Sequence, residues 1–518
     1  MGTGSQSLSP PERRRGILVL ILQGHNFSFE LENLCRLFFF RQGVHIANVP
    51  ELGEDFLVTE MHPKKDGMHF NALLCLDGET WEQSASLFKP DADHPEALEH
   101  ALCRLVYELC IKATPVRPSW GLLTGIRPVK LVTQCREKGM EENEIFRYFT
   151  QDYLVSPRKA SLALETERNE REILARSFPQ SFSLYISIPF CPTRCSYCSF
   201  VSQDMRGAAK LVPDYLNKLC RELEVIGEKV RSWGLRLQTV YFGGGTPTTL
   251  SAEQLELLLG HVAQQFDLSG CQEYTVEAGR PDTITREKLQ VMKQAGVDRI
   301  SINPQTFQDS VLEAIGRCHT AAEVLEKYGL AREEGFDFIN MDLIAGLPSD
   351  TVEGFQKTLD TALSLEPENL TVHTLSLKRS STLTMQGEGL SVYDNPAEEM
   401  MEYALSRTRQ AGYAPYYLYR QKNTLGNLEN IGFAKDRRFG LYNVYIMEET
   451  HTILAAGAGS STKLVHPFQN QIRRVFDYKY PVEYIRGFEE MLRRKDEIDR
   501  FYQQVFSCDR NRQGFYEK

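Results

Sequence analysis

The chain has 518 residues, of which 42% are hydrophobic and 25% charged, and this is the composition of an ordinary globular protein. At about 150 residues per domain, its length predicts two to four domains. A net charge of −10 argues against general binding to nucleic acid or to anionic membranes, so an anionic ligand requires a local basic pocket.

The first part of the chain carries no pattern typical of export or membrane insertion. Residues 1–15 end in PPERRR and have the composition of a disordered segment. The apolar run at 17–24 is too short to span a bilayer and lacks a small-residue cleavage site, so it predicts a strand. Most of the 12 cysteines stand singly in apolar stretches, which is typical of free thiols in a reducing compartment. We therefore expect a cytoplasmic protein without an integral membrane segment.

Residues 16–178 predict an N-terminal α+β domain. Apolar runs predict strands at 17–22, 55–61 and 69–76, and apolar residues at helical spacing predict helices at 27–40 and 95–113. We find no motif in this region that indicates a particular chemistry.

Residues 179–385 alternate short apolar runs with amphipathic stretches. Strands are predicted at 183–188, 239–243, 274–278, 299–303, 338–344 and 370–377, with helices at 212–233, 251–266, 285–296 and 350–365. Such strand–helix repeats predict a parallel sheet with right-handed crossovers. Six units make three quarters of an eight-fold barrel, so we expect an α/β protein built on a partial (β/α)6 barrel. In such barrels the chemistry lies at the C-terminal ends of the strands.

Residues 386–518 predict a C-terminal α+β extension. A helix is predicted at 396–412, a strand at 450–457 and a final charged helix near 482–503. The GAGSS segment at 457–461 is either a backbone wall of the active site or an ordinary glycine turn.

Polar groups recur near the ends of the predicted barrel strands. In strand order they are the cysteines after 188, GGGTPT at 243–248, Glu277, Asn303 with Gln305, Asp342 and His373. Because the C-terminal ends of parallel barrel strands meet at one edge, we expect these groups to lie together.

The loop CPTRCSYC places Cys191, Cys195 and Cys198 at the spacing C-x3-C-x2-C. Three thiols do not make a disulfide framework, and structural zinc requires a fourth ligand that this stretch does not supply. Core packing rarely brings three cysteines so close in sequence. The spacing therefore favours an iron–sulfur cluster with one iron left open to bind a substrate or a cofactor.

Three nearby features indicate what an open iron would bind. The glycines at 243–245 permit close approach of backbone to a ligand. Arg317, in the helical stretch 309–320, can form a bidentate pair with a carboxylate. Asp342 stands in an apolar strand, where a carboxylate needs partners, and two sugar hydroxyls would serve. A tight turn, a solvated arginine and a paired structural aspartate are the plainer interpretations. An amino acid, a ribose and an open iron together describe S-adenosylmethionine (SAM) bound to a cluster.

On these motifs the chain resembles the radical SAM enzymes, and within them the oxygen-independent coproporphyrinogen III oxidase group. The matching stretches are YISIPFCPTRCSYCSF, YFGGGTPTTL, VEAGRPDTI, RISINPQTFQDSVLEAIGRCHT and NMDLIAGLP, where AGRPD is one residue longer than usual. The well-studied oxidases of the group carry a further cysteine at the position of Phe200. The haem-chaperone and HemZ-type branches carry phenylalanine there, as this chain does. The N-terminal domain, YRQKNTLGNLENIGF at 419–433 and LYNVYIMEE at 441–449 favour the HemZ-type coproporphyrinogen dehydrogenase branch.

The resemblance implies roles for individual residues. Cys191, Cys195 and Cys198 would hold a [4Fe–4S] cluster whose fourth iron is chelated by the amino and carboxylate groups of SAM. Further SAM contacts are implied for Gly244, Gly245 and Thr246 (methionine amino end), Glu277, Gln305 and Asp342 (ribose region), Arg317 (carboxylate) and Tyr185, which would pack near the cofactor.

The implied reaction converts two propionates of coproporphyrinogen III to vinyl groups, which gives protoporphyrinogen IX. An electron donor such as flavodoxin or ferredoxin is expected as a partner. A haem-binding carrier of the same family without decarboxylase activity and radical-mediated haem ring opening are the alternatives. A porphyrinogen has several carboxylates, so its pocket needs cations. The candidates are Arg194, Lys378, Arg379, Arg420 and Lys422.

Overall fold

The structure, a computed structural model, describes residues 16–39, 42–49, 53–125, 127–376, 396–421 and 424–508. The candidate cations Lys378, Arg379 and Lys422 lie outside the described residues. Internal contacts divide the chain into two compact units: one holds residues up to 126 together with 136–161, and the other holds 127–135 together with 162 onward.

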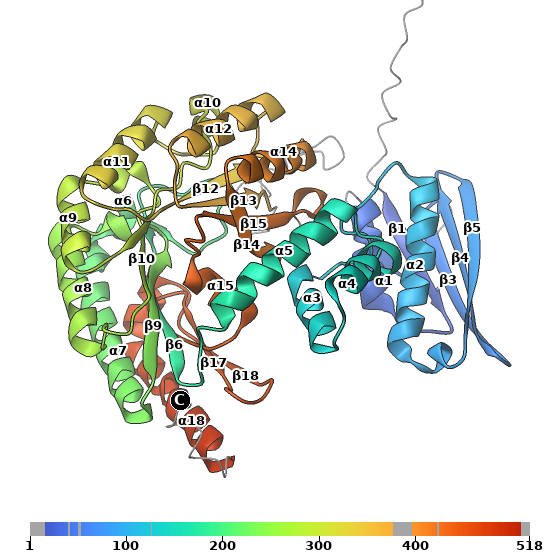
Figure 1. The fold of residues 1–518 in the computed structure, drawn as a ribbon, viewed down its shortest axis with the longest axis horizontal. Coiled ribbons are helices and arrows are strands. Elements are labelled where there is room, and N and C mark those ends of the chain that lie inside the picture. Colours follow the sequence, from blue (N-terminus) through green and yellow to red (C-terminus); the bar gives the residue numbers. More distant parts are fainter. Residues whose placement is uncertain are drawn as a thin grey trace, which may run out of the picture. The chain divides into compact units, whose positions relative to one another are not determined.

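The first unit contains a five-stranded sheet with the order β2-β1-β3-β4-β5. Its strands are β1 (Ile17–Gln23), β2 (Gly43–Ile46), β3 (Asp55–Lys64), β4 (Gly67–Leu76) and β5 (Glu79–Phe88). Helices α1 (Ser28–Phe38) and α2 (Pro95–Ala113) pack against it, and one apolar core joins them to the sheet (Figure 1). The predicted strands and helices of this region are confirmed. Sequence patterns missed β2 and β5, since neither is an apolar run.

In chain order, three helices follow the five-stranded sheet and α2 and precede the first barrel strand: α3 (Pro128–Glu137), α4 (Glu142–Arg147) and α5 (Pro157–Leu174).

The second unit is built on an eleven-stranded sheet with the order β14-β15-β13-β12-β11-β10-β9-β6-β16-β17-β18. Its centre is formed by β6 (Ser181–Ile188), β9 (Arg236–Gly244), β10 (Glu273–Glu277), β11 (Arg299–Ser301), β12 (Ile339–Ala345) and β13 (Asn369–Thr374). All five pairings among these six neighbours are parallel. The six strands are those that the apolar runs predicted, and the partial (β/α)6 barrel is confirmed.

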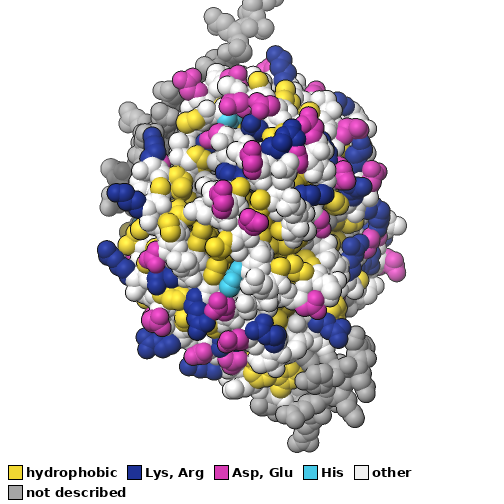
Figure 2. Space-filling view, turned by 90° about the vertical axis from the view of Figure 1, so that its left-hand side faces the viewer, with side chains coloured by type: hydrophobic (Ala, Val, Ile, Leu, Met, Phe, Trp, Pro, Cys, Tyr) yellow, Lys and Arg dark blue, Asp and Glu magenta, His cyan; other side chains and the backbone are white. Residues whose placement is uncertain are grey.

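Helices cover the outer side of these strands (Figure 1). They are α7 (Val212–Trp233), α8 (Ala252–Gln265), α9 (Arg286–Gln294), α10 (Asp309–Ala314), α11 (Ala321–Glu333) and α12 (Val352–Ser364). Four begin after a hydroxyl side chain that accepts a hydrogen bond from the first turn, namely Ser251, Thr285, Thr320 and Thr351. On the side where α8, α9 and α11 lie, acidic and basic side chains are interspersed (Figure 2).

The C-terminal region extends the barrel sheet at both edges. Its elements are α14 (Ala397–Gln410), β14 (Tyr413–Arg420), β15 (Glu429–Lys435), α15 (Leu441–Glu448), β16 (Thr452–Ala456), β17 (Ser461–Val465) and β18 (Ile472–Phe476). β16 pairs in parallel with β6, whereas β15 pairs antiparallel with β13. The predicted domain boundaries at 178 and 385 stay predictions. The strands of the barrel region and those of the C-terminal region belong to one sheet.

The predicted single helix near 482–503 is wrong. Three short helices stand there, α16 (Pro481–Arg486), α17 (Phe488–Arg494) and α18 (Asp496–Cys508). Gly487 separates the first two, and a Cβ at this position would lie 2.4 Å from the ring of Tyr478, so the chain bends where only glycine fits. Within the described ranges, none of the helices combines the length and hydropathy needed to cross a membrane.

Candidate functional site

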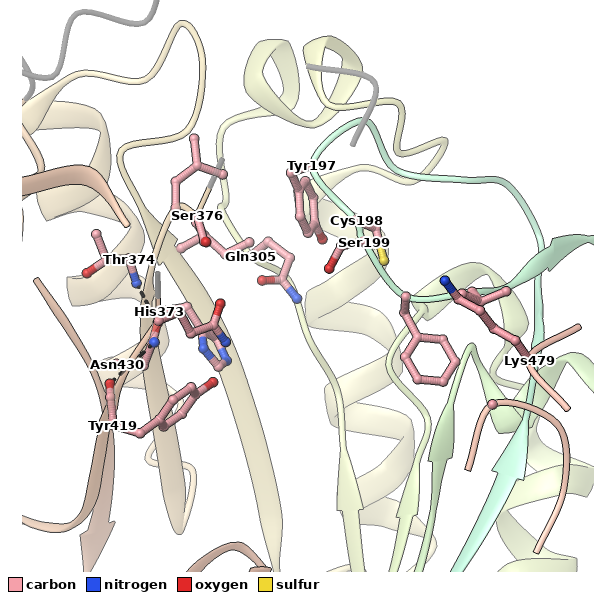
Figure 3. Close-up of a pocket in the computed structure, with 16 residues that line it drawn as sticks. Tyr197, Cys198, Ser199, Gln305, His373, Thr374, Ser376, Tyr419, Asn430 and Lys479 are labelled. Carbon is pink, nitrogen blue, oxygen red and sulfur yellow. Dashed lines mark hydrogen bonds between the residues drawn. The ribbon is translucent and has the colours of Figure 1, made fainter. Parts of the chain in front are cut away.

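Two neighbouring cavities lie in the barrel, one at the C-terminal ends of its strands and one farther inside, between the strands. The larger, of about 610 Å³, is lined by the cysteine loop after β6 and by residues of β13, β14 and β15. The smaller, of about 150 Å³, lies among the strands and is lined mainly by polar side chains. His373 and Tyr419 line both cavities. In Figure 3 the Gln305 side chain stands between His373 on one wall and Tyr197 with Ser199 on the other.

The cysteine loop runs between β6 and α7 and includes the short pair β7 (Phe190–Cys191) and β8 (Gln203–Asp204), followed by α6 (Met205–Ala208). Cys195 is buried, and Cys198 lines the larger cavity. The hydroxyl of Thr246 donates to Cys191 Sγ at 3.6 Å.

Two of the three thiols, Cys191 and Cys198, need a positive partner to ionise. Burial raises the pKa of Cys191 and of Cys198, so at neutral pH a metal or another cation is required to hold them as thiolates. In the described part of the chain, no three His, Cys, Asp or Glu side chains are close enough to bind a single metal ion. A four-iron cluster attaches each thiolate to a different iron and therefore uses a wider set of ligands.

The glycine stretch after β9 packs directly on the cysteine loop. Gly244 has φ +105°, and a Cβ there would lie 2.9 Å from Ser187 Oγ and 3.3 Å from the Phe200 ring. The backbone N–H of Gly245 donates to Ile188 O at 2.8 Å, and that of Thr246 to Phe190 O at 2.7 Å. The glycines thus allow the ends of β9 and β6 to touch. Their contacts with SAM stay a prediction.

Glu277 and Asp342 line the smaller cavity, as the strand positions predicted. The Tyr241 hydroxyl donates to Glu277 Oε1 at 2.6 Å. Burial raises the pKa of Glu277 to about 7; the Tyr241 hydrogen bond opposes this shift and Asp342 adds to it. The ring of Tyr185 stacks against those of Tyr241 and Tyr442, with centroids 6.2 and 6.1 Å away. Tyr185 therefore belongs to an aromatic cluster beside this carboxyl.

Asp342 is held in its ionised form. Burial works against ionisation, but His373 and a hydrogen bond from Asn340 outweigh it and lower the pKa. The Asn340 amide donates to Oδ1 at 2.8 Å, and His373 Nε2 lies 3.8 Å from Oδ2. A carboxylate facing a polar cavity can accept hydrogen bonds from two neighbouring hydroxyls.

Gln305 has φ +68°, which is rare for a residue with a side chain. Its backbone N–H donates to Asp342 O at 2.9 Å, and its carbonyl accepts from Ile344 N–H at 3.0 Å. These two bonds fasten the segment after β11 to β12. The conformation sends the amide toward the larger cavity (Figure 3).

The prediction that Arg317 lies within a helix is wrong. Helix α10 ends at Ala314, and Gly316, with φ +76°, turns the chain before Arg317. The guanidinium is buried and donates to Asn303 O at 2.6 Å and to the Tyr197 hydroxyl at 3.2 Å. Arg317 thus faces the cysteine loop.

The candidate cations of the pocket are placed differently from the prediction. Arg194 is exposed and lines neither cavity. Arg420 is buried, and its Nε donates to Asn427 O at 3.1 Å, because it lies on β14 with its side chain covered. Sequence reasoning missed Lys479, which lines the larger cavity. Gly459 lines it too, so the GAGSS segment forms part of the wall.

The residues present fit a cluster with a polar cofactor. Several buried polar atoms of the described residues have no hydrogen-bond partner, and four of them lie on the cysteine loop or beyond β11: Ser196 Oγ, Asn303 Oδ1, Gln305 Oε1 and Arg317 Nε. Buried polar atoms are normally paired, so four of them on the cysteine loop and beyond β11 indicate a site for a ligand that supplies partners. Three thiols, an arginine and the two carboxyl groups that line the smaller cavity fit the cluster, the carboxylate and the ribose of cluster-bound SAM.

Residues 185–362 match the Radical SAM superfamily. The chain is 40% identical over 432 residues to the oxygen-independent coproporphyrinogen-III oxidase-like protein HemZ of Bacillus subtilis (strain 168), an alignment covering 82% of this chain and 86% of HemZ. It is 34% identical over 309 residues to the heme chaperone HemW of the same organism, covering 58% of this chain and 77% of HemW. Among solved structures, the coproporphyrinogen III oxidase HemN of Escherichia coli matches with a TM-score of 0.48 and 23% identity, over 62% of this chain and 72% of HemN.

Fold, motif and match define the chain as a member of the radical SAM superfamily, in which a [4Fe–4S] cluster and SAM are the shared cofactors. Within it, the chain belongs to the HemZ-type family of oxygen-independent coproporphyrinogen-III oxidase-like proteins.

Proposed function

We propose that the chain is an oxygen-independent coproporphyrinogen III oxidase. It would convert two propionates of coproporphyrinogen III to vinyl groups, releasing carbon dioxide from each and yielding protoporphyrinogen IX. One-electron donors such as flavodoxin or ferredoxin would supply the reducing electrons, in the cytoplasm.

One observation carries the proposal on the structural side. A cavity of about 610 Å³ opens directly beside Cys198 and shares the lining residues His373 and Tyr419 with the polar cavity that Glu277 and Asp342 line. A substrate in the larger cavity would thus meet a cofactor held in the smaller one. The 40% identity to a coproporphyrinogen-III oxidase-like protein supports the choice of a porphyrinogen.

When bound, the cluster supplies the electron that cleaves SAM, and SAM supplies the radical that abstracts a hydrogen atom. The chain's own residues bind and orient. Cys191, Cys195 and Cys198 would ligate the cluster, and Arg317 would pair with the SAM carboxylate. Asp342, kept ionised by its neighbours, would accept hydrogen bonds from the ribose hydroxyls.

The remaining groups shape the space for substrate. Glu277, whose pKa is about 7, can offer either a donor or an acceptor near neutrality. Lys479, on the wall of the larger cavity, would meet a propionate carboxylate. The Phe200 ring and Gly459 form an apolar, closely packed part of the same wall, which would exclude water from the reacting carbon.

A haem carrier is the second candidate, because the heme chaperone HemW is 34% identical over 58% of the chain. The two functions differ in their chemistry. A carrier requires a stable haem complex and consumes no SAM in proportion to product, whereas an oxidase yields one methionine and one 5′-deoxyadenosine per propionate.

The deciding experiment is strictly anaerobic incubation of reconstituted protein with coproporphyrinogen III, SAM, a reductant and an electron acceptor. Mass spectrometry of the porphyrins and quantification of 5′-deoxyadenosine are read from the same samples. The matched variants are Cys198→Ala and Cys271→Ala. The first should form no product. The second should retain activity, because Cys271 lies just before the N-terminal end of β10, away from the cysteine loop. Tight haem binding with 5′-deoxyadenosine but no vinyl product over several acceptors would reject the oxidase in favour of the carrier or of haem ring opening.

A further inference from the structure

A second buried arginine contacts the cysteine loop from behind. Arg280 Nη1 lies 3.8 Å from Cys195 Sγ and donates to the Thr193 hydroxyl at 3.2 Å. Its side chain is only 4% exposed. The remaining guanidinium nitrogens, Nε and Nη2, donate to the two oxygens of Asp282 at 3.0 Å each. Each of its nitrogens therefore has an assigned partner, and one of those partners is a thiol predicted to be a cluster ligand.

The loop after β10 places Arg280 there. Glu277 ends the strand, and Pro281 starts a tight turn at 281–283. The Thr283 hydroxyl donates to Arg280 O at 2.7 Å, and it also shares a hydrogen bond of 2.6 Å with Thr248. The turn after β10 thus lets Glu277 face the small cavity while Arg280 turns back onto Cys195.

The two sides of the Arg280 guanidinium differ in their exposure to solvent. The Asp282 carboxylate that orients Arg280 is 24% exposed and is partly screened by water. The guanidinium face toward Cys195 is buried, where charges act with less screening. Arg317 also interacts with this thiol. Its Nη1 and Nη2 donate to Asn303 and Tyr197, its Nε has no partner among the described residues, and its assigned partner is the SAM carboxylate.

We propose that Arg280 raises the reduction potential of the cluster held by Cys195. Taking up one electron from an external donor adds one negative charge to the cluster and its thiolates. Hydrogen bonds to the ligand sulfurs and nearby net charge are the protein's means of setting such potentials. A buried cation that donates to the ligand sulfur stabilises the reduced form more than the oxidised form. This inference rests on the proposed cluster site but is independent of the porphyrinogen substrate.

The test is a redox titration of anaerobically reconstituted protein without SAM, followed by electron paramagnetic resonance of the reduced cluster. Iron and sulfide are measured on every sample. Arg280→Gln removes the charge but keeps an amide donor, and Arg280→Lys keeps the charge but loses the fork that binds Asp282. Arg286→Gln is the control, since Arg286 lies on α9 and pairs with the exposed side of α11.

We expect Arg280→Gln to disfavour reduction at least tenfold, which corresponds to a fall of about 59 mV for a one-electron couple. Arg280→Lys should give a smaller fall, and Arg286→Gln none. An unchanged potential in Arg280→Gln with four irons bound would overturn the proposal. If that variant binds no iron, Arg280→Lys decides, and its failure to shift the potential would overturn the proposal equally. Parent protein that binds no iron would overturn the proposed function as well, so the two failures are distinguishable.

Discussion

Lys495 is a buried cation behind the GAGSS segment, and its removal tests what holds that wall in place. Its Nζ lies 2.8 Å from Glu222 Oε1 and 2.9 Å from Asp477 Oδ1, and all three side chains are fully buried. Glu222 accepts a hydrogen bond from Gly457 N–H at 2.9 Å, and Asp477 accepts one from the Ser460 hydroxyl at 2.7 Å. The ion cluster therefore anchors both ends of the wall segment.

Lys495→Met keeps much of the volume but leaves two buried carboxyl groups without a cation. Removing one partner of a buried ion pair typically costs about 3–5 kcal/mol. We therefore expect the free energy of unfolding to fall by about 3–5 kcal/mol at pH 7.

The pH dependence separates charge from packing. Burial and the neighbouring Glu222 already raise the pKa of Asp477 to about 7, and Lys495 opposes this shift. A carboxyl whose pKa is raised in the folded state contributes stability that is present at low pH and lost as the pH rises through that pKa. Without Lys495 that pKa rises further, so the two folded proteins differ in the protonation of Asp477 only above pH 7, and the deficit of the variant should grow between pH 7 and pH 9 by up to about 2.7 kcal/mol.

The assay is urea unfolding of the metal-free protein, followed by circular dichroism at both pH values. Lys435→Met is the control, because Lys435 pairs with an exposed glutamate, Glu366, and should leave the unfolding free energy unchanged. A deficit below about 1 kcal/mol, or one equal at pH 7 and pH 9, would refute the reasoning, because it would place the loss in packing or show that the carboxyl groups find other partners.

Three further predictions concern the cavities. Cys195→Ala should abolish iron binding and SAM cleavage whereas Cys271→Ala should not, as measured by iron analysis; full iron content in the first variant would contradict the cluster assignment. Arg317→Ala and Asp342→Ala should each weaken SAM binding at least tenfold in calorimetry with iron intact, since removing a buried charge partner costs about 2–5 kcal/mol. Glu277→Gln should flatten the pH dependence of unfolding: the pKa of Glu277 is raised from 4.5 to about 7, so its stabilising contribution is present below pH 4.5 and lost by pH 7. That loss amounts to up to about 3 kcal/mol, and identical slopes for parent and variant would contradict it.

The barrel was predictable because each of its strands is a short apolar run followed by a helix. The parallel pairing of β16 with β6 was not, since residues about 270 apart in sequence share no local pattern that indicates pairing. The strand at 450–457 was predicted, but not that it would enlarge the barrel sheet. The prediction of a single final helix was wrong for a local reason. Gly487 lies against Tyr478, and helical periodicity in the sequence does not reveal this contact.

Some residues of the candidate site could likewise be predicted from the sequence, and others could not. Glu277, Gln305 and Asp342 were predicted because each follows from its position on a strand, and strand ends meet by topology. Arg420 was expected at the cavity, but its place on β14 buries it within the sheet. Lys479 gave no signal, since it reaches the cavity only through the folding of the C-terminal region onto the barrel.

The three cysteines are not equivalent, and the difference bears on how the site works. Cys195 is buried beside the guanidinium of Arg280, whereas Cys198 lines the larger cavity and Cys191 accepts a hydrogen bond from Thr246. Positive charge therefore approaches the loop from its buried side, while the cavity side is left for a cofactor and substrate. A charge added by reduction would be stabilised from behind by Arg280, while Lys479 on the cavity wall is left to meet the substrate. On this arrangement, the Arg280 variants should alter the potential, and variants of Lys479 should alter substrate affinity alone. A Lys479→Ala protein with an altered potential would show that the two sides are not electrostatically separate.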